Sequence, residues 1–150
     1  MPEFEITDAG YSITPPAGKA LVLNGVQIRK ITQTVLYSQF TDGAAALGTF
    51  DLSEPIPVGA IFLHGAITNI VGFAGDTSAV ITVGDGTDVD RYNAGTPSVF
   101  TSIANGIALG VPSGVLYHAA QKTVKLYVTS AADFTSVSAG SVTVELYYIT

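Results

Sequence analysis

Cysteine and tryptophan are both absent from the 150 residues, and charged side chains make up only 12% of them. Without cysteine the chain has no disulfide framework, no thiolate nucleophile and no cysteine-based zinc site. Only six residues are basic, Arg29 and Lys30 form the single adjacent pair, and the net charge is −6. Because binding to phosphates requires clustered Lys and Arg, this charge balance argues against a nucleic-acid partner.

Long hydrophobic runs are also missing, although 47% of the residues are hydrophobic and the mean hydropathy is +0.43. The most apolar stretch, "AIFLHGAITNIVGFAG" (60–75), is interrupted by polar residues and falls short of the roughly 18 apolar residues of a membrane span. The opening "MPEFEITDAG" lacks the basic and apolar regions of a signal peptide. We therefore expect no membrane partner, and we expect neighbouring chains to cover part of a surface so poor in charge.

Two segments, 123–129 and 142–149, alternate cleanly between apolar and polar residues. A period of two predicts antiparallel strands with one buried face. The residues expected to face inward are Val124, Leu126, Val128, Val142, Val144, Leu146 and Tyr148. Those expected to face outward are Lys125, Tyr127, Thr143, Glu145 and Tyr147.

Segment 60–73 is apolar on both faces, which predicts a central strand with a kink at Gly65. The turn "AGDTS" follows it, so we expect 78–84 to form a hairpin with it. Segment 26–40 has strand-forming residues but a helix-like spacing of apolar positions, which a strand with a bulge near Lys30 would reconcile. Further short strands are expected near 4–6, 20–24, 46–52, 98–103 and 114–118.

About eight strands separated by Gly and Pro predict an all-β antiparallel fold, either a sandwich, a jelly roll or a barrel-like structure. We assign residues 20–150 to this single domain. Residues 1–19 are polar and acidic and end in "TPPAGK", so we interpret them as an N-terminal arm that packs along its own domain or reaches a neighbour.

The stretch "ITVGDGTDVDRYNAG" (81–95) is the strongest candidate for a site. Asp85, Asp88 and Asp90 are hard oxygen donors of the kind that calcium prefers. Their spacing is not that of an EF-hand, and the glycine–aspartate motif of calcium-binding β-helices would have to repeat. A "DG" after an alternating run favours a turn in which Asp accepts backbone hydrogen bonds and Arg91 pairs with a carboxylate. We predict this turn, and an ion site stays open as the alternative.

No residue pattern indicates catalysis. No spacing singles out a pair of carboxylates, and the loop 84–90 lacks the lysine of a phosphate-binding loop. His64 and His118 are far apart and are predicted to be packed strand residues rather than bases. We therefore expect no enzyme and assign no catalytic, cofactor-binding or metal residue. Four tyrosines at strand positions are expected to make cross-strand pairs or to anchor an interface: Tyr117, Tyr127, Tyr147 and Tyr148.

Three segments, in this order, resemble virion structural proteins of tailed bacteriophages, most closely head decoration (capsid cement) proteins. They are residues 31–73, 80–95 ("VITVGDGTDVDRYNAG") and 138–150 ("SAGSVTVELYYIT"). In the first of them, residues 39–42 take the place of the family's turn and residues 58–61 that of the start of its long central strand. The resemblance covers about residues 27–150 and rests on turn and strand signatures rather than on catalytic motifs.

The resemblance implies an antiparallel sandwich of jelly-roll or β-tulip type. It also implies a decoration protein that stabilises the phage head by binding the lattice of the major capsid protein. It further implies a homotrimer on the outer capsid surface of the virion, made in the host cytoplasm. Two alternatives stay open, a tail or neck component of the virion and a carbohydrate or host-surface binding module that uses residues 84–93. The N-terminal arm has no counterpart in the resemblance, and arms determine which virion surface a protein binds.

Overall fold

The computed structural model describes residues 3–7, 10–14, 22–23, 26–101, 106–110, 112 and 116–150. Strands and two short 3-10 helices account for the regular structure of these residues. In chain order they are β1 (Glu3–Thr7), β2 (Gly10–Thr14), β3 (Val22–Leu23), β4 (Val26–Leu36), η1 (Tyr37–Gln39), β5 (Thr41–Asp42), β6 (Leu47–Asp51), β7 (Ile61–Ala74), β8 (Ala79–Gly84), β9 (Gly106–Ala108), β10 (Lys125–Ser130), η2 (Phe134–Ser136) and β11 (Ala139–Ile149).

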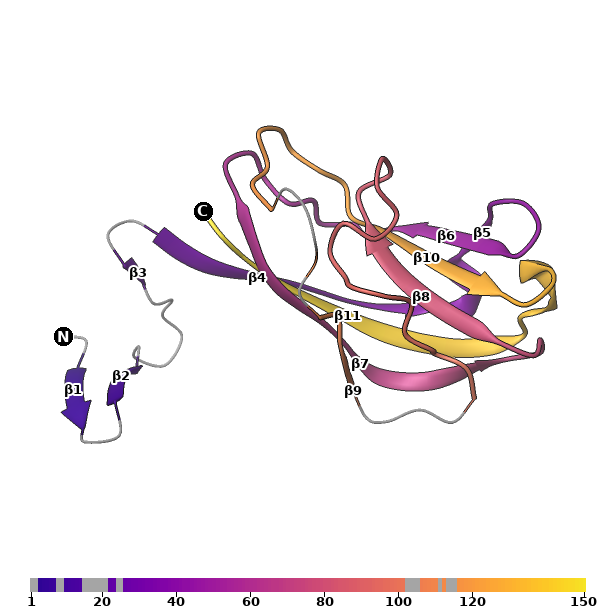
Figure 1. Cartoon of the computed structure of the whole chain (residues 1–150), viewed down its shortest axis with the longest axis horizontal. Helices are drawn as coiled ribbons and strands as arrows, with labels where there is room; N and C mark the ends of the chain where they lie inside the picture. The colour runs from indigo at the N-terminus through magenta and orange to yellow at the C-terminus, as the bar shows by residue number, and fades with distance from the viewer. Residues whose placement is uncertain are drawn as a thin grey trace.

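Two antiparallel sheets form the sandwich (Figure 1). The smaller sheet has the strand order β5-β6-β10-β8, and the larger sheet has the order β3-β4-β11-β7-β9. Strands β1 and β2 pair only with each other among the described residues. The predicted all-β antiparallel sandwich is confirmed, whereas its jelly-roll or β-tulip subtype and the division at residue 20 stay predictions.

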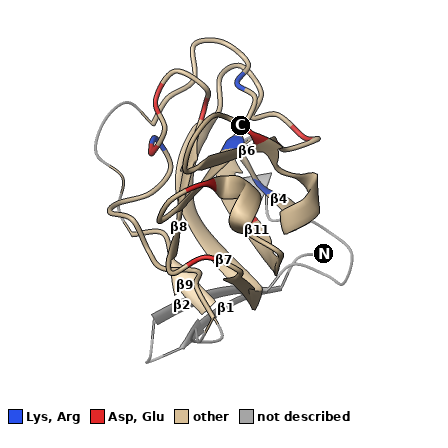
Figure 2. Ribbon diagram, turned by 90° about the vertical axis from the view of Figure 1, so that its right-hand side faces the viewer, with Lys and Arg blue, Asp and Glu red and all other residues tan. Residues whose placement is uncertain are grey.

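The core lies between the two sheets and takes side chains from both. Phe40 packs against Phe73 and Phe134, with ring centroids 6.0 and 5.8 Å apart. Figure 2 shows that acidic and basic residues gather mainly in loops and near strand ends, while the long strands are largely free of them. Within the described residues, no helix is long and apolar enough to cross a membrane.

Strands β10 and β11 show the alternation that the sequence predicts, and all seven residues expected to face inward are buried. Tyr127 and Thr143 were expected to face solvent, but each is only 7% exposed, and this part of the prediction is wrong. For Tyr127, the loop after the neighbouring strand β8 accounts for the difference, because the Gly86 backbone of this loop lies against the Tyr127 side chain. Periodicity identifies the face of a strand, but it does not reveal a loop that folds over that face.

Strand β4 is regular, so the bulge predicted near Lys30 is wrong. Its pairing with β11 runs from Ile28 to Leu36 without a register shift. In a straight strand Ile31 and Val35 share the inner face, while Ile28 lies on the opposite face and is 48% exposed. The strand ends at Leu36 rather than at residue 40, because η1 follows it.

Strand β7 is central in its sheet, as predicted, but it does not form a hairpin with β8. It pairs with β11 and β9, whereas β8 pairs with β10 in the other sheet, so residues 75–78 connect the two sheets. Gly65 itself pairs in register with Leu146, while the pairing with β11 shifts beside it, at residues 62–64, and again between residues 68 and 74, where Asn69 has a φ of 46°. Gly65 provides room for packing, since a Cβ there would lie 2.8 Å from Leu109 and from Leu146.

The shorter predicted strands are only partly confirmed. Segment 46–52 contains β6, and the segments near 4–6 and 20–24 contain β1 and β3. Near 98–103 the described residues form only isolated bridges at Ser98 and Phe100, and near 114–118 they form one at Tyr117. The remainder of these two segments, residues 102–103 and 114–115, lies outside the described residues.

Candidate functional site

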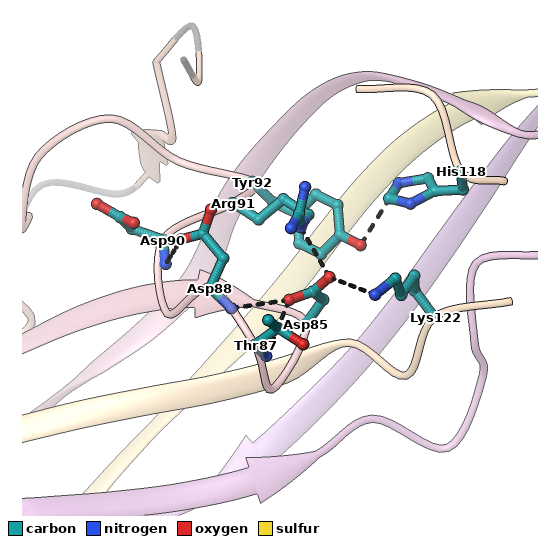
Figure 3. A network of polar contacts seen from close by, with 8 residues as sticks. All are labelled: Asp85, Thr87, Asp88, Asp90, Arg91, Tyr92, His118 and Lys122. Carbon is teal, nitrogen blue, oxygen red and sulfur yellow. Dashed lines mark hydrogen bonds and ion pairs between the residues drawn. The ribbon is translucent and has the colours of Figure 1, made fainter. Parts of the chain in front are cut away.

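The loop of residues 84–93 is closed by the side chain of Asp85 (Figure 3). Asp85 Oδ1 accepts hydrogen bonds from the backbone N–H of Thr87 (3.0 Å) and of Asp88 (2.9 Å), and the Asp85 N–H donates to the Asp88 carbonyl (3.0 Å). Asp88 Oδ1 in turn accepts from the Asp90 N–H at 3.3 Å. The predicted turn, in which Asp side chains accept local backbone hydrogen bonds, is confirmed.

Glycine is required at the point where β8 enters this loop. A Cβ on Gly84 would lie 2.0 Å from the Asp88 carbonyl oxygen, closer than any side chain can approach. Gly86 has a φ of +83°, which non-glycine residues rarely adopt. The close approach lets the loop turn back, so that the Tyr92 N–H donates to the Val83 carbonyl at 2.9 Å.

Two cations hold the other oxygen of the Asp85 carboxylate. Asp85 Oδ2 lies 2.7 Å from Arg91 Nε and 3.1 Å from Lys122 Nζ, and the Asp85 side chain is fully buried. The pairing of Arg91 with a nearby carboxylate is confirmed. Lys122 belongs to a distant segment, and nothing in its local sequence indicates this partner. The ion pair between Asp85 and Lys122 therefore connects the loop to the segment that leads into β10.

The pKa of Asp85 reflects a balance of opposing effects. Burial disfavours the charged carboxylate, but backbone hydrogen bonds from Asp88 and Thr87, together with Lys122 and Arg91, outweigh it and hold the pKa at about 2, below its ordinary value of 3.8. Asp85 is therefore ionised at neutral pH. Its four partners all belong to this chain, so the carboxylate serves the internal structure of the loop.

His118 is packed in the interior next to this network, as predicted, although it lies in a loop rather than in a strand. Its ring is 2% exposed, lies 5.6 Å from the Tyr92 ring, and its Nε2 is 3.5 Å from the Tyr92 hydroxyl. Burial and the neighbouring Arg91 lower the pKa of His118, and burial raises that of Tyr92. His118 is thus a neutral side chain in the core, with no surface to offer to a substrate.

The structure adds no further ligand to the ion site that the sequence left open as an alternative to the turn. Asp85 is occupied internally, and a hydrogen bond with Asp88 raises the pKa of Asp90. In the part of the chain that the structure describes, no three acidic or histidine residues are placed to hold a metal ion.

The second candidate region is the outer face of the larger sheet, defined as the face of β4, β11 and β7 that points away from the smaller sheet. Its middle carries the few polar side chains with defined partners. His64 stacks on Tyr147 with ring centroids 5.3 Å apart and planes 5° apart. The Tyr147 hydroxyl donates to Glu145 (3.1 Å), and Lys30 Nζ lies 3.4 Å from the Glu145 carboxylate. His64 is therefore a strand residue, as predicted, but its side chain is exposed and stacks on Tyr147 rather than packing in the core.

One end of the outer face carries four apolar side chains in register, which we name the apolar row: Ile28, Ile149, Ile61 and Tyr117. Ile28 pairs with Ile149, Ile149 with Ile61, and Ile61 forms a bridge with Tyr117. Directly opposite residues of antiparallel strands point to the same face, so the four side chains lie side by side. Ile28, Ile61 and Tyr117 are 48%, 41% and 54% exposed.

The remaining tyrosines divide between the core and the outer face. Tyr148 is buried at 4% exposure, as expected for an inward position, and Tyr147 is half-buried on the outer face. Of the four tyrosines, Tyr117 is the most exposed and ends the apolar row. Sequence patterns identified these residues singly, but the row is visible only once the strand pairing is known.

No protein-family model matches the chain, and no curated protein matches its sequence. A solved structure does match. The fold is similar to that of a chain in the cyanophage Pam1 capsid asymmetric unit. The two chains share 20% sequence identity with a TM-score of 0.62, and the match covers 91% of this chain and 96% of that chain. At this identity the likeness shows a shared fold, and it agrees with the resemblance to phage virion proteins noted from the sequence.

Proposed function

We propose that this chain is a structural protein of a phage virion and, more specifically, a capsid decoration protein. In this proposal it forms a homotrimer on the outer surface of the head and stabilises the lattice of the major capsid protein. The observation that carries the proposal is the fold likeness to a chain of the Pam1 capsid asymmetric unit, which covers nearly all of both chains. The likeness therefore concerns the whole domain rather than one supersecondary unit.

The distribution of charge supports a role based on contact with neighbouring proteins. A decoration protein works by burying surface on its neighbours, at about 25 cal/mol per Å² of apolar area and over interfaces of roughly 1,600 Å² before association costs. The outer face of the larger sheet offers such a surface, with apolar and hydroxyl side chains along long strands. The proposal includes no catalytic step and no cofactor.

Virions of the phage that encodes the chain provide the test. Quantitative mass spectrometry of purified virions should find the protein at a copy number comparable to that of the major capsid protein. Immunogold labelling of intact virions with an antibody against the chain should decorate the heads. A protein absent from the virions would overturn the virion role altogether.

The same measurements separate the alternatives. Gold at the tail or neck, with only a few copies per virion, would replace the decoration role by that of a tail or neck component. For a host-surface module, the purified chain should bind host cells or glycans and lose that binding in Asp88→Ala and Asp90→Ala. A melting temperature that is the same in EDTA and in calcium is expected for a decoration protein whose loop is a turn.

A further inference from the structure

We propose that copies of this chain associate with one another through the apolar row (Ile28, Ile149, Ile61 and Tyr117). The solvent-facing side of an antiparallel sheet is ordinarily polar. Here three neighbouring strands and the bridged residue Tyr117 place apolar side chains at the same level, and three of these side chains are 41–54% exposed.

Two more exposed apolar residues lie beside the row. Val26 (40% exposed) precedes Ile28 by two positions on β4, and Leu63 (44%) lies two positions after Ile61 on β7. Figure 1 shows that the start of β4, the end of β11 and the start of β7 meet at one end of the sandwich. Single exposed apolar residues need no explanation, but a contiguous group of this kind marks an interaction surface.

The charge distribution favours a second copy as the occupant. Two chains of net charge −6 repel each other on approach, and this repulsion is weakest where each presents no net charge. On the outer face, the charged groups among the described residues are Lys30 and Glu145, which form an ion pair. Two copies can therefore bring their apolar rows together without bringing like charges together.

The apolar row and its surroundings also resemble a subunit interface in composition. Interfaces have an apolar and aromatic centre, in which a few residues carry most of the binding energy, and a polar rim. The row provides three isoleucines and one tyrosine for the centre. Hydroxyl side chains follow along the same face, where Thr34 Oγ1 and Thr143 Oγ1 are hydrogen-bonded at 2.8 Å. Rows from neighbouring copies would meet around the symmetry axis of a closed oligomer.

Sedimentation velocity of the full-length chain over a range of micromolar concentrations tests the proposal. The wild-type chain should sediment as an oligomer, and Ile61→Lys should raise its dissociation constant roughly 10- to 100-fold, because a charge is placed at the centre of the contact. Val71→Lys is the matched control, since Val71 lies on the same strand, is 61% exposed and is outside the row. The control should assemble like the wild type.

A second variant protects the test against loss of folding. Ile28→Lys places the same charge in the row from a different strand, and circular dichroism with thermal melting checks that each variant is folded. A monomeric wild-type chain, row variants that assemble like the wild type, or an equal loss in Val71→Lys would each overturn the proposal. Because the purified chain is used, the result does not depend on whether the protein binds phage heads.

Discussion

The loop of residues 84–93 and the outer face of the larger sheet use their side chains in opposite ways. In the loop, the charged Asp85 is fully buried and paired with Arg91 and Lys122 of the same chain. On the outer face, apolar side chains such as Ile28 and Tyr117 are about half exposed. The charged groups of the loop are thus paired with one another, whereas the apolar side chains of the outer face are exposed to solvent.

This contrast reverses the impression that the sequence gives. The acidic loop looks like a binding site because its charges stand out in a chain that has few of them. A buried carboxylate with four internal partners stabilises its loop, but it has little capacity left for a ligand. The exposed apolar area is not covered by the described residues, so it is the region where a partner protein gains most from binding.

The largest effect on stability is expected from removing the buried charge of Asp85. Asp85→Ala should lower the free energy of unfolding by about 4 kcal/mol, because it leaves two cations facing each other and two backbone N–H groups without an acceptor. Asp90→Ala, at an exposed position of the same loop, should cost less than about 0.5 kcal/mol. Urea unfolding of both variants measures the difference, and equal effects would refute the structural role of Asp85.

Glycine substitutions compare the backbones of the two regions. Gly84→Ala should cost about 3 kcal/mol, because its Cβ would lie 2.0 Å from the Asp88 carbonyl oxygen. Gly106→Ala in β9 should instead be neutral or stabilise the chain by about 0.5 kcal/mol, since the nearest atom to its Cβ is 3.8 Å away. Thermal melting can rank the two variants. A tolerated alanine at residue 84 would mean that the loop can shift at little cost.

The pH dependence of the free energy of unfolding also tests the role of Asp85. The pKa of Asp85 is about 2 in the folded chain and 3.8 ordinarily, so the unfolded chain takes up this proton first as the pH falls. The stabilisation is therefore complete above about pH 4 and is lost as the pH falls to about 2, and it amounts to about 2 kcal/mol. Urea midpoints measured across this range should fall more steeply for the wild type than for Asp85→Asn. Parallel curves would show that Asp85 does not contribute to acid unfolding.

The smallest effect on stability is expected on the outer face. At concentrations where the chain is monomeric, Ile28→Thr should change the free energy of unfolding by less than about 0.5 kcal/mol, because the side chain is already half exposed. Ile31→Thr, three residues along the same strand but 1% exposed, should cost several times more. Chemical denaturation of dilute samples measures both, and a large cost at residue 28 would mean that the chain itself covers the row.

The sequence predicted the features of this fold that depend on local periodicity. The alternation in β10 and β11 identified their inner faces correctly, and the "DG" turn was identified with its carboxylate acceptors. Strand pairing could not be read in this way, because β7 and β8 are adjacent in the chain but belong to different sheets. Tyr127 was misassigned for the same reason, since its cover comes from a loop on the neighbouring strand.

The candidate site was predictable only in part. Asp85 and Arg91 are six positions apart, and their pairing follows from local chemistry. Lys122 completes the network from a distant segment, and its position depends on the complete fold. The apolar row is harder still to foresee, because its four members come from separate segments that only the sheet register aligns.

The positions of β10 and β11 have a consequence for how the chain acquires its structure. β10 lies between β6 and β8, and β11 lies between β4 and β7, so late segments of the sequence supply an interior strand to each sheet. Contacts such as that between Thr34 and Thr143 join residues 109 positions apart. During synthesis on a ribosome, β4, β6, β7 and β8 each lack their β10 or β11 partner until residues 125–149 emerge. Such long-range pairing makes folding slow, and it places the completion of both sheets in one late, shared step.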